Sequence, residues 1–232
     1  MSILSNLDWN AIRDHYDQRV DVHLEMERLY KTAKKSKSQF ADLALGISDP
    51  AGNYSADRYK FGPAILEANK YKGSYQAVYD LAGQFIPVTD AAKEVPALIR
   101  KANLKYLAIS VGSEIACMMN PRNCWVGNAR TVFAYIGWDQ GLDKAVEAHD
   151  LFADRSPGSE ADYSLWEEYY PFLGKALSEI AAEGARLARQ ENALLGDIIP
   201  FLWADAIASA AYDRYALRKI DRLSFVTGLG IR

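Results

Sequence analysis

The spacing of apolar residues constrains the fold of this chain most strongly, because they recur at steps of three and four along most of the sequence. This spacing places side chains on one face of an α-helix, whereas a half-buried strand needs alternation at every second residue, which is nearly absent. Stretches rich in Pro, Gly, Asn and Asp are short, which favours antiparallel neighbouring helices. The sequence therefore predicts an all-α, compact multi-helix bundle of about eight to ten helices with short connections.

Capping residues and helix breakers predict where these helices begin and end. Asp8 is a typical N-cap for a first helix that runs to about Lys35, and Ser74 and Thr89 are expected caps of two later helices. The other expected helices cover residues 38–47, 63–72, 75–85, the segment after Thr89 with Pro96 as a candidate interruption, 104–119, 128–136, 139–152, 160–192 with a break or kink at Pro171, and 201–222.

With 232 residues the chain is long enough to bury a substantial core. We expect a single all-helical domain over residues 1–232, with candidate sub-boundaries in the loops 48–62 and 154–159. The net charge of −3 argues against nucleic acid and anionic membranes as partners. The N-terminus lacks a basic region followed by an apolar run, so no secretory signal is expected, and cytoplasm is the expected compartment.

The most unusual segment is Tyr106–Trp138, which has 33 residues and three charged side chains, Glu114, Arg122 and Arg130. It is long enough to span a bilayer, but these charges and Asn120-Pro121 favour buried helix in a soluble protein. The two cysteines, Cys117 and Cys124, also lie here and are expected to be buried and reduced.

A carboxylate buried in such a segment is costly unless a partner compensates its charge. Glu114 shares one helix face with Ser110, Ser113 and Cys117, and a second acid, Asp205, lies one turn before Ser209 in an apolar segment that continues to Tyr212. Because Arg130 is a strong cation close to Glu114 in sequence, we expect its guanidinium to bind both carboxylates.

Two interpretations of this set remain open. In one, Glu114, Arg130 and Asp205 are catalytic, with a raised pKa on one acid, and a second group of side chains binds an anionic ligand. The expected ligand-binding residues are Asn128, Arg122, Ser113 and Tyr212. In the other, favoured interpretation, the same charges form a structural network that fixes helix register. The polar loop 120–128 is likewise either part of a site or a set of helix caps.

Metal and cofactor sites are not predicted. Asp139, Asp143 and Glu147 stand at steps of four and could hold Mg²⁺, but no second acidic motif faces them, so a solvated acidic face is favoured. The histidine His23 lacks the Glu-x-x-His context of helical di-iron sites. The basic run from Arg28 to Lys37 suits the C-terminal end of a helix. We therefore expect no metal and no cofactor.

No motif identifies a reaction, so the sequence leaves enzymatic activity undecided. The leading hypothesis is a cytoplasmic protein that acts by binding another protein, as an adaptor, an inhibitor or an immunity-type factor, or by self-association as a homodimer. The chain has 14 tyrosines and five tryptophans, an acidic segment over 139–183 and an apolar tail over 223–232, which suit an interface. The alternative is a small helical enzyme or ligand-binding protein with a buried Glu/Arg/Asp site and a small anionic ligand.

Overall fold

The computed structural model describes residues 2–32, 37–56, 61–153, 160–194 and 196–217. Over these ranges the chain is all-α, which confirms the predicted fold class, and it contains no strand. The ten α-helices are α1 (Trp9–Thr32), α2 (Ser38–Ala44), α3 (Gly62–Ala68), α4 (Ser74–Phe85), α5 (Ala91–Ala102), α6 (Ile109–Met119), α7 (Ala129–Asp139), α8 (Leu142–Ala153), α9 (Glu160–Gln190) and α10 (Pro200–Tyr212). Shorter helical turns cover Pro50–Gly52, Lys70–Lys72 and Asp213–Leu217.

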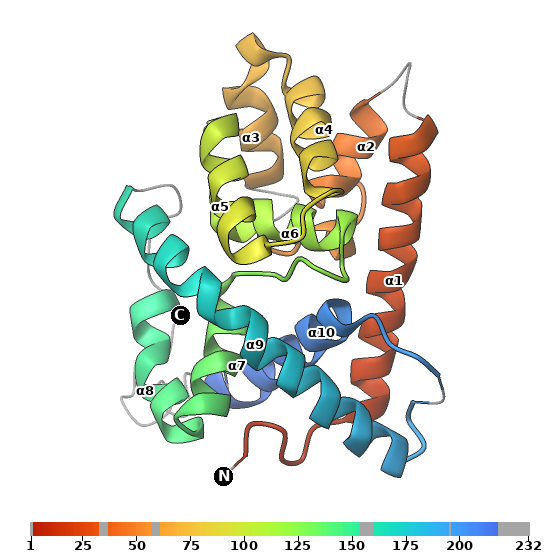
Figure 1. The fold of residues 1–232 in the computed structure, drawn as a ribbon, viewed down its shortest axis with the longest axis vertical. Coiled ribbons are helices and arrows are strands. Elements are labelled where there is room, and N and C mark those ends of the chain that lie inside the picture. The colour runs from red at the N-terminus through yellow and green to blue at the C-terminus, as the bar shows by residue number, and fades with distance from the viewer. Residues whose placement is uncertain (1, 33–36, 57–60, 154–159, 195, 218–232) are drawn as a thin grey trace, which may run out of the picture.

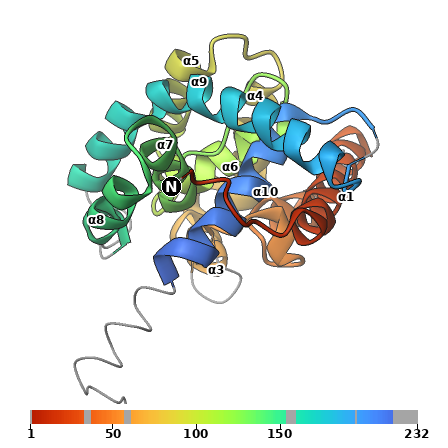
Figure 2. The ribbon, with the colours of Figure 1, turned by 90° about the horizontal axis from the view of Figure 1, so that it is seen from below.

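The helix α10 lies in the middle of the molecule. Helices α1, α7 and α9 pack around it, while α2 to α6 form the end of the molecule that is uppermost in Figure 1. The view from below shows α10 running between α1 and α7, with the N-terminus beside α7 (Figure 2). Alanines along α10 allow close approach, and a Cβ on Gly184 of α9 would lie 2.3 Å from Ile207 of α10. The apolar face of each helix therefore meets one continuous core.

The predicted helix cap Asp8 is confirmed, and Asn128 is the cap of a further helix. The Oδ1 atom of Asp8 accepts hydrogen bonds from the backbone N–H groups of Asn10 and Ala11, each at 3.1 Å. Asn128 and Thr131 form a reciprocal capping box at the start of α7. The other two predicted caps, Ser74 and Thr89, each lie one residue away from the observed cap position. Gly73, in a left-handed conformation, precedes α4, so that Ser74 is already helical. Asp90 precedes α5, where Glu94 accepts from the N–H groups of Thr89 and Asp90.

The predicted start of α6 at Leu104 was wrong. Residues 103–108 form a tight connection in which Asn103 and Tyr106 both have left-handed backbone conformations, with φ of 48° and 68°. A helix cannot pass through such residues, so α6 begins at Ile109. The predicted helix 38–47 is also shorter than expected, because α2 ends at Ala44.

Neither proline ends its helix, so the expected interruption at Pro96 and the expected break at Pro171 are wrong, while the alternative of a kink at Pro171 stays a prediction. Pro96 is buried in α5 beside Val95, so packing of this face outweighs the lost backbone hydrogen bond. In α9, Tyr170 and Leu173 are fully buried on either side of Pro171 and hold the helix against the core. The loop 154–159, the apolar tail and the last residues of the predicted helix 201–222 lie outside the described residues. Among the described helices, none combines the length and apolarity that a membrane span requires.

Candidate functional site

The carboxylate of Glu114 is 1% exposed, and both of its oxygens accept several hydrogen bonds. The backbone N–H of Tyr54 donates to Oε2 at 2.8 Å, and the N–H of Ser55 donates to Oε1 at 2.9 Å. The Ser55 hydroxyl and the Asn128 amide also donate to Oε1. Glu114 on α6 therefore anchors the loop that follows Pro50–Gly52, and its acceptor capacity is used within the protein.

The cation that pairs with Glu114 is Arg19 of α1, which is fully buried. Its Nη1 lies 3.5 Å from Oε2 of Glu114, and its Nη2 lies 3.1 Å from Oδ2 of Asp205 on α10. Nη1 also donates to the backbone oxygen of Ala51 at 2.6 Å. Burial opposes the charged form of Arg19, but Asp205 and Glu114 outweigh burial and raise its pKa. One guanidinium thus links α1, α6, α10 and the loop after α2.

The expectation that Arg130 binds both acids was wrong. Among the described residues no carboxylate lies within ion-pair distance of Arg130, whose guanidinium carbon lies 5.4 Å from the centre of the Tyr54 ring. The guanidinium carbon of Arg19 lies at the same distance, 5.4 Å, from this ring. Arg130 is the second residue of α7 and is only half-buried, whereas α1 brings Arg19 between the two acids. Proximity in the sequence therefore did not predict which arginine pairs with Glu114 and Asp205.

A signal for Arg19 was present in the sequence. Arg19 follows Tyr16 by three residues and precedes His23 by four, and it therefore lies on the apolar face of the first helix. A cation on such a face needs a buried acid, just as the buried acid needs a cation.

The predicted ligand-binding residues differ in their contacts and exposure. Ser113 accepts from the N–H of Gly127 at 2.8 Å, and Asn128 caps α7 while it binds Glu114. The hydroxyl of Tyr212 lies 2.8 Å from Nε2 of His149. Arg122 is exposed in the turn after α6, away from this network. The loop 120–128 therefore acts largely by capping helices and tying them together, so the structure supports the structural interpretation.

The other acidic candidates lie at the surface. Asp139, Asp143 and Glu147 are exposed, and Glu147 forms an ion pair with Lys144. Within the ranges that the structure describes, no three His, Cys, Asp or Glu side chains are close enough together to hold a metal ion.

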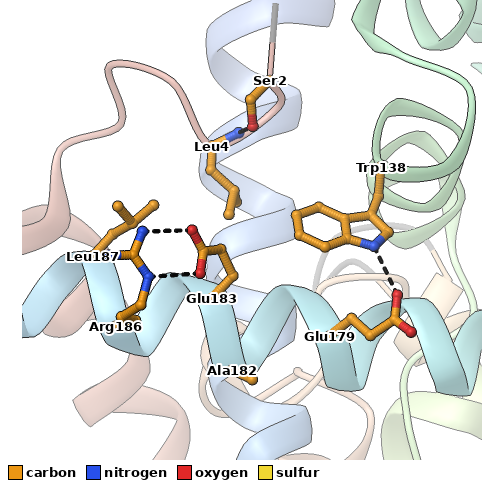
Figure 3. Close-up of a pocket in the computed structure, with 8 residues that line it drawn as sticks. All are labelled: Ser2, Leu4, Trp138, Glu179, Ala182, Glu183, Arg186 and Leu187. Atoms are coloured by element: carbon orange, nitrogen blue, oxygen red, sulfur yellow. Dashed lines mark hydrogen bonds and ion pairs between the residues drawn. The ribbon is translucent and has the colours of Figure 1, made fainter.

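A surface pocket of about 570 Å³ lies between the N-terminal segment, Trp138 and α9 (Figure 3). Its polar side chains are already paired with one another. The indole N–H of Trp138 donates to Glu179 at 2.9 Å, and Arg186 forms two hydrogen bonds with Glu183. A ligand would have to compete with these contacts, so this pocket is a poor candidate for a site.

An exposed set of tyrosines and lysines that was not predicted from the sequence lies on two segments, the turn Lys70–Lys72 between α3 and α4, at the top of Figure 1, and the connection between α5 and α6. Tyr71 is 77% exposed and Tyr106 is 41% exposed. The Nζ atom of Lys72 lies 5.7 Å from the centre of the Tyr71 ring, and that of Lys105 lies 5.1 Å from the centre of the Tyr106 ring. We call Lys70, Tyr71, Lys72, Lys105 and Tyr106 the tyrosine–lysine surface.

A buried asparagine holds the two segments of this surface together. Asn69, which is 1% exposed, donates to the backbone oxygen of Lys105 at 3.0 Å and accepts from its N–H at 2.9 Å. Lys72 donates to the backbone oxygen of Asn103 from the same side. The left-handed backbone of Tyr106 costs roughly 1–2 kcal/mol for a residue with a side chain. The fold thus fixes an exposed aromatic ring in a strained position, which is a feature of binding loops.

A comparison of this chain with protein-family models, curated proteins and solved structures finds no match, so the geometry alone carries the functional argument.

Proposed function

We propose that this protein acts by binding another protein through the tyrosine–lysine surface. The observation that carries the proposal is the presentation of Tyr106, whose left-handed backbone follows directly on Lys105, the residue that Asn69 clamps, while its ring is exposed. Tyrosine is among the residues that contribute most binding energy at interfaces, because it buries a large area at a small cost in side-chain entropy. A rigid presentation also lowers the entropy lost on binding.

The charge of the surface indicates the character of the partner. Lys70, Lys72 and Lys105 are all exposed, in a chain whose net charge is −3. Glu67 offsets part of this charge through its ion pair with Lys70. A local cationic surface on an anionic protein steers and orients a partner with the opposite charge. We therefore infer an acidic protein segment, which agrees in class with the protein partner expected from the sequence.

The buried network supports binding over catalysis. The acceptor sites of Glu114 are occupied by backbone and side-chain donors, and Arg19 and Asp205 are sealed from solvent beside it. Such groups hold helices in register rather than exchange protons with a substrate. The two free, buried cysteines, Cys117 and Cys124, suit the cytoplasm as the proposed compartment. Self-association as a homodimer is a separate outcome of the test below.

The test is photocrosslinking in the native host, with a photoreactive amino acid at Tyr75, which is 42% exposed in the first turn of α4. The same amino acid at Phe172, 59% exposed on α9, reports background. We expect one crosslinked protein from position 75, identified by mass spectrometry. Its purified form should bind the unmodified protein with an affinity that falls as salt rises.

Charge reversal provides the matched control. Lys72→Glu with Lys105→Glu should abolish the crosslink, whereas Lys31→Glu with Lys175→Glu, two exposed lysines elsewhere, should leave it intact. If the Lys72→Glu, Lys105→Glu variant crosslinks as strongly as the Lys31→Glu, Lys175→Glu control, the proposal is overturned. If nuclease digests the crosslinked partner and protease does not, the partner is a nucleic acid, which contradicts the proposal. A crosslink to a second copy of the chain would replace the acidic partner by a homodimer.

A further inference from the structure

A second pocket, of about 340 Å³, opens between the first turns of α1 and the end of α10. Leu7, Ile12 and His15 line it on one side, and Asp213 and Arg214 line it on the other. At Asp213 the chain leaves α10 and enters the π-helical turn Asp213–Leu217, a local geometry that is frequent at functional sites. The volume is at the lower end of the range for small-molecule sites, about 300–1,000 Å³.

This pocket differs from the one in Figure 3 in having a polar group without a partner. The Nε2 atom of His15 is enclosed and forms no hydrogen bond in the described structure. Leaving a buried polar atom unpaired costs about 1–3 kcal/mol, and a ligand that supplies the bond recovers this cost. One turn before Asp213 in α10, the buried hydroxyl of Ser209 also lacks a partner among the described residues. Two buried polar atoms on the helices that line this pocket are therefore unsatisfied.

The charges around the pocket favour an anion. Arg214 lies over the Tyr215 ring, 5.7 Å from its centre, and no carboxylate of the described residues lies within ion-pair distance of it. Of the two carboxylates that line the pocket, Asp8 already caps α1 and Asp213 is exposed to water, which screens it. An incoming carboxylate would thus meet an unpaired guanidinium, while an incoming ammonium group would have to displace a helix cap or rely on a solvated acid.

The electrostatic environment of His15 also favours a negatively charged ligand. The pKa of its imidazole is lowered to about 4, chiefly by burial and then by the positive charges of Arg19 and Arg130, which outweigh the opposite effect of Asp213 and Glu114. His15 is consequently neutral near pH 7, with one ring nitrogen able to donate a hydrogen bond. The ring stands in a net positive environment, which an anion would neutralise.

We propose that this pocket binds a small monocarboxylate with an apolar body. Arg214 pairs with the carboxylate, the His15 imidazole donates a hydrogen bond to it, and Leu7 and Ile12 contact the apolar part of the ligand. The elements that line the pocket, the first turns of α1 and the end of α10, lie at the end of the molecule opposite α3 and α4 (Figure 1), so this inference does not rest on the proposed protein partner.

The test uses three probes with equal chain length, which are hexanoate, hexylammonium and hexanol. Isothermal titration calorimetry measures affinity, and NMR of the His15 ring reports the site, which is simple because the chain has three histidines. We expect hexanoate to bind, to move the His15 signals and to raise the pKa of His15. Hexylammonium should leave these signals unchanged, and hexanol should bind at least about tenfold more weakly, because it lacks the charge that Arg214 recognises.

Arg214→Gln should weaken hexanoate binding by about tenfold or more, which corresponds to the loss of one charged hydrogen bond. Arg186→Gln, at an exposed arginine that lines the pocket in Figure 3, is the matched control and should bind hexanoate as before. Three results would overturn the proposal: His15 signals that ignore hexanoate, signals that respond equally to hexylammonium, or an unchanged hexanoate affinity in a folded Arg214→Gln protein. A circular dichroism melt confirms that each variant is folded.

Discussion

Arg19 lies closer to Asp205 than to Glu114, with nitrogen–oxygen distances of 3.1 Å and 3.5 Å. The two acids come from α10 and α6, so a single guanidinium faces two carboxylates. The second negative charge is compensated by the N–H groups of Tyr54 and Ser55, which donate to Glu114. Because these donors belong to the backbone, the charge balance of the core depends on the position of a loop.

Replacing Glu114 by Gln should destabilise the protein strongly. The side-chain amide would place its own N–H₂ group against the donors that now bind the carboxylate, and Arg19 would lose one of its two anions. Removing one member of a buried charge network costs about 3–5 kcal/mol. Urea unfolding at pH 7 measures this change, with Glu25→Gln, at an exposed pair with Arg28, as the control that should change little. A Glu114→Gln protein with unchanged stability and lost function would instead favour a catalytic site.

The loop that reaches Glu114 should be equally sensitive at Gly52. A Cβ at this position would lie 2.1 Å from the backbone oxygen of Leu43, and a backbone atom cannot move aside cheaply. Gly52→Ala should therefore displace the loop, weaken its bonds to Glu114 and lower stability by about 1–3 kcal/mol. Gly196→Ala, where a Cβ meets nothing within 4 Å, is the matched control. Similar melting temperatures for the two variants would show that the loop tolerates the shift.

The fold class could be predicted from the sequence because helical periodicity depends on local spacing. The caps Asp8 and Asn128 were also predictable, since an N-cap needs only a short polar side chain before an apolar repeat. The prediction failed where tertiary contacts outweigh local preference. Pro96 and Pro171 remain inside helices whose buried side chains, such as Val95 and Tyr170 directly before them, pack against the core, and this cannot be seen in a local pattern.

The buried site was predicted in kind but not in composition. Glu114 and Asp205 are indeed buried and share a guanidinium, which the cost of burying charge requires. The identity of that guanidinium depends on how α1 packs against α6 and α10, because Arg19 lies 95 residues before Glu114 in the chain. The tyrosine–lysine surface was missed for a similar reason. Its two segments, which include Tyr71 and Tyr106, are distant in the sequence and are joined by hydrogen bonds from the side chains of Asn69 and Lys72.

The stability of the protein should fall as His15 is protonated. The pKa of His15 is lowered, chiefly by burial, from 6.5 to about 4 in the folded state. The unfolded chain therefore takes up the proton first as pH falls, so the stabilisation is fully present above pH 6.5 and is lost progressively down to pH 4. Over that interval the loss amounts to about 3 kcal/mol.

Urea unfolding at a series of pH values measures this loss for the wild type and for His15→Gln, which cannot be protonated. The difference in unfolding free energy between the two proteins should decrease from pH 7 to pH 4. A constant difference would mean that His15 has an ordinary pKa in the folded protein. Parallel carboxylate titrations affect both proteins equally, so they cancel in the comparison.

Tyr106 should show opposite effects on stability and on binding. Its φ of 68° lies in the left-handed region, which glycine adopts without strain, and its ring is 41% exposed. Tyr106→Gly should therefore keep or raise the unfolding free energy, by up to about 1 kcal/mol, while partner binding falls by about tenfold or more. Tyr106→Phe keeps the ring and the backbone strain, and should change neither quantity greatly. If Tyr106→Gly still binds the partner, the strained tyrosine is not the anchor of the interface. If Tyr106→Gly is more stable but no longer binds, the fold retains this backbone strain for recognition.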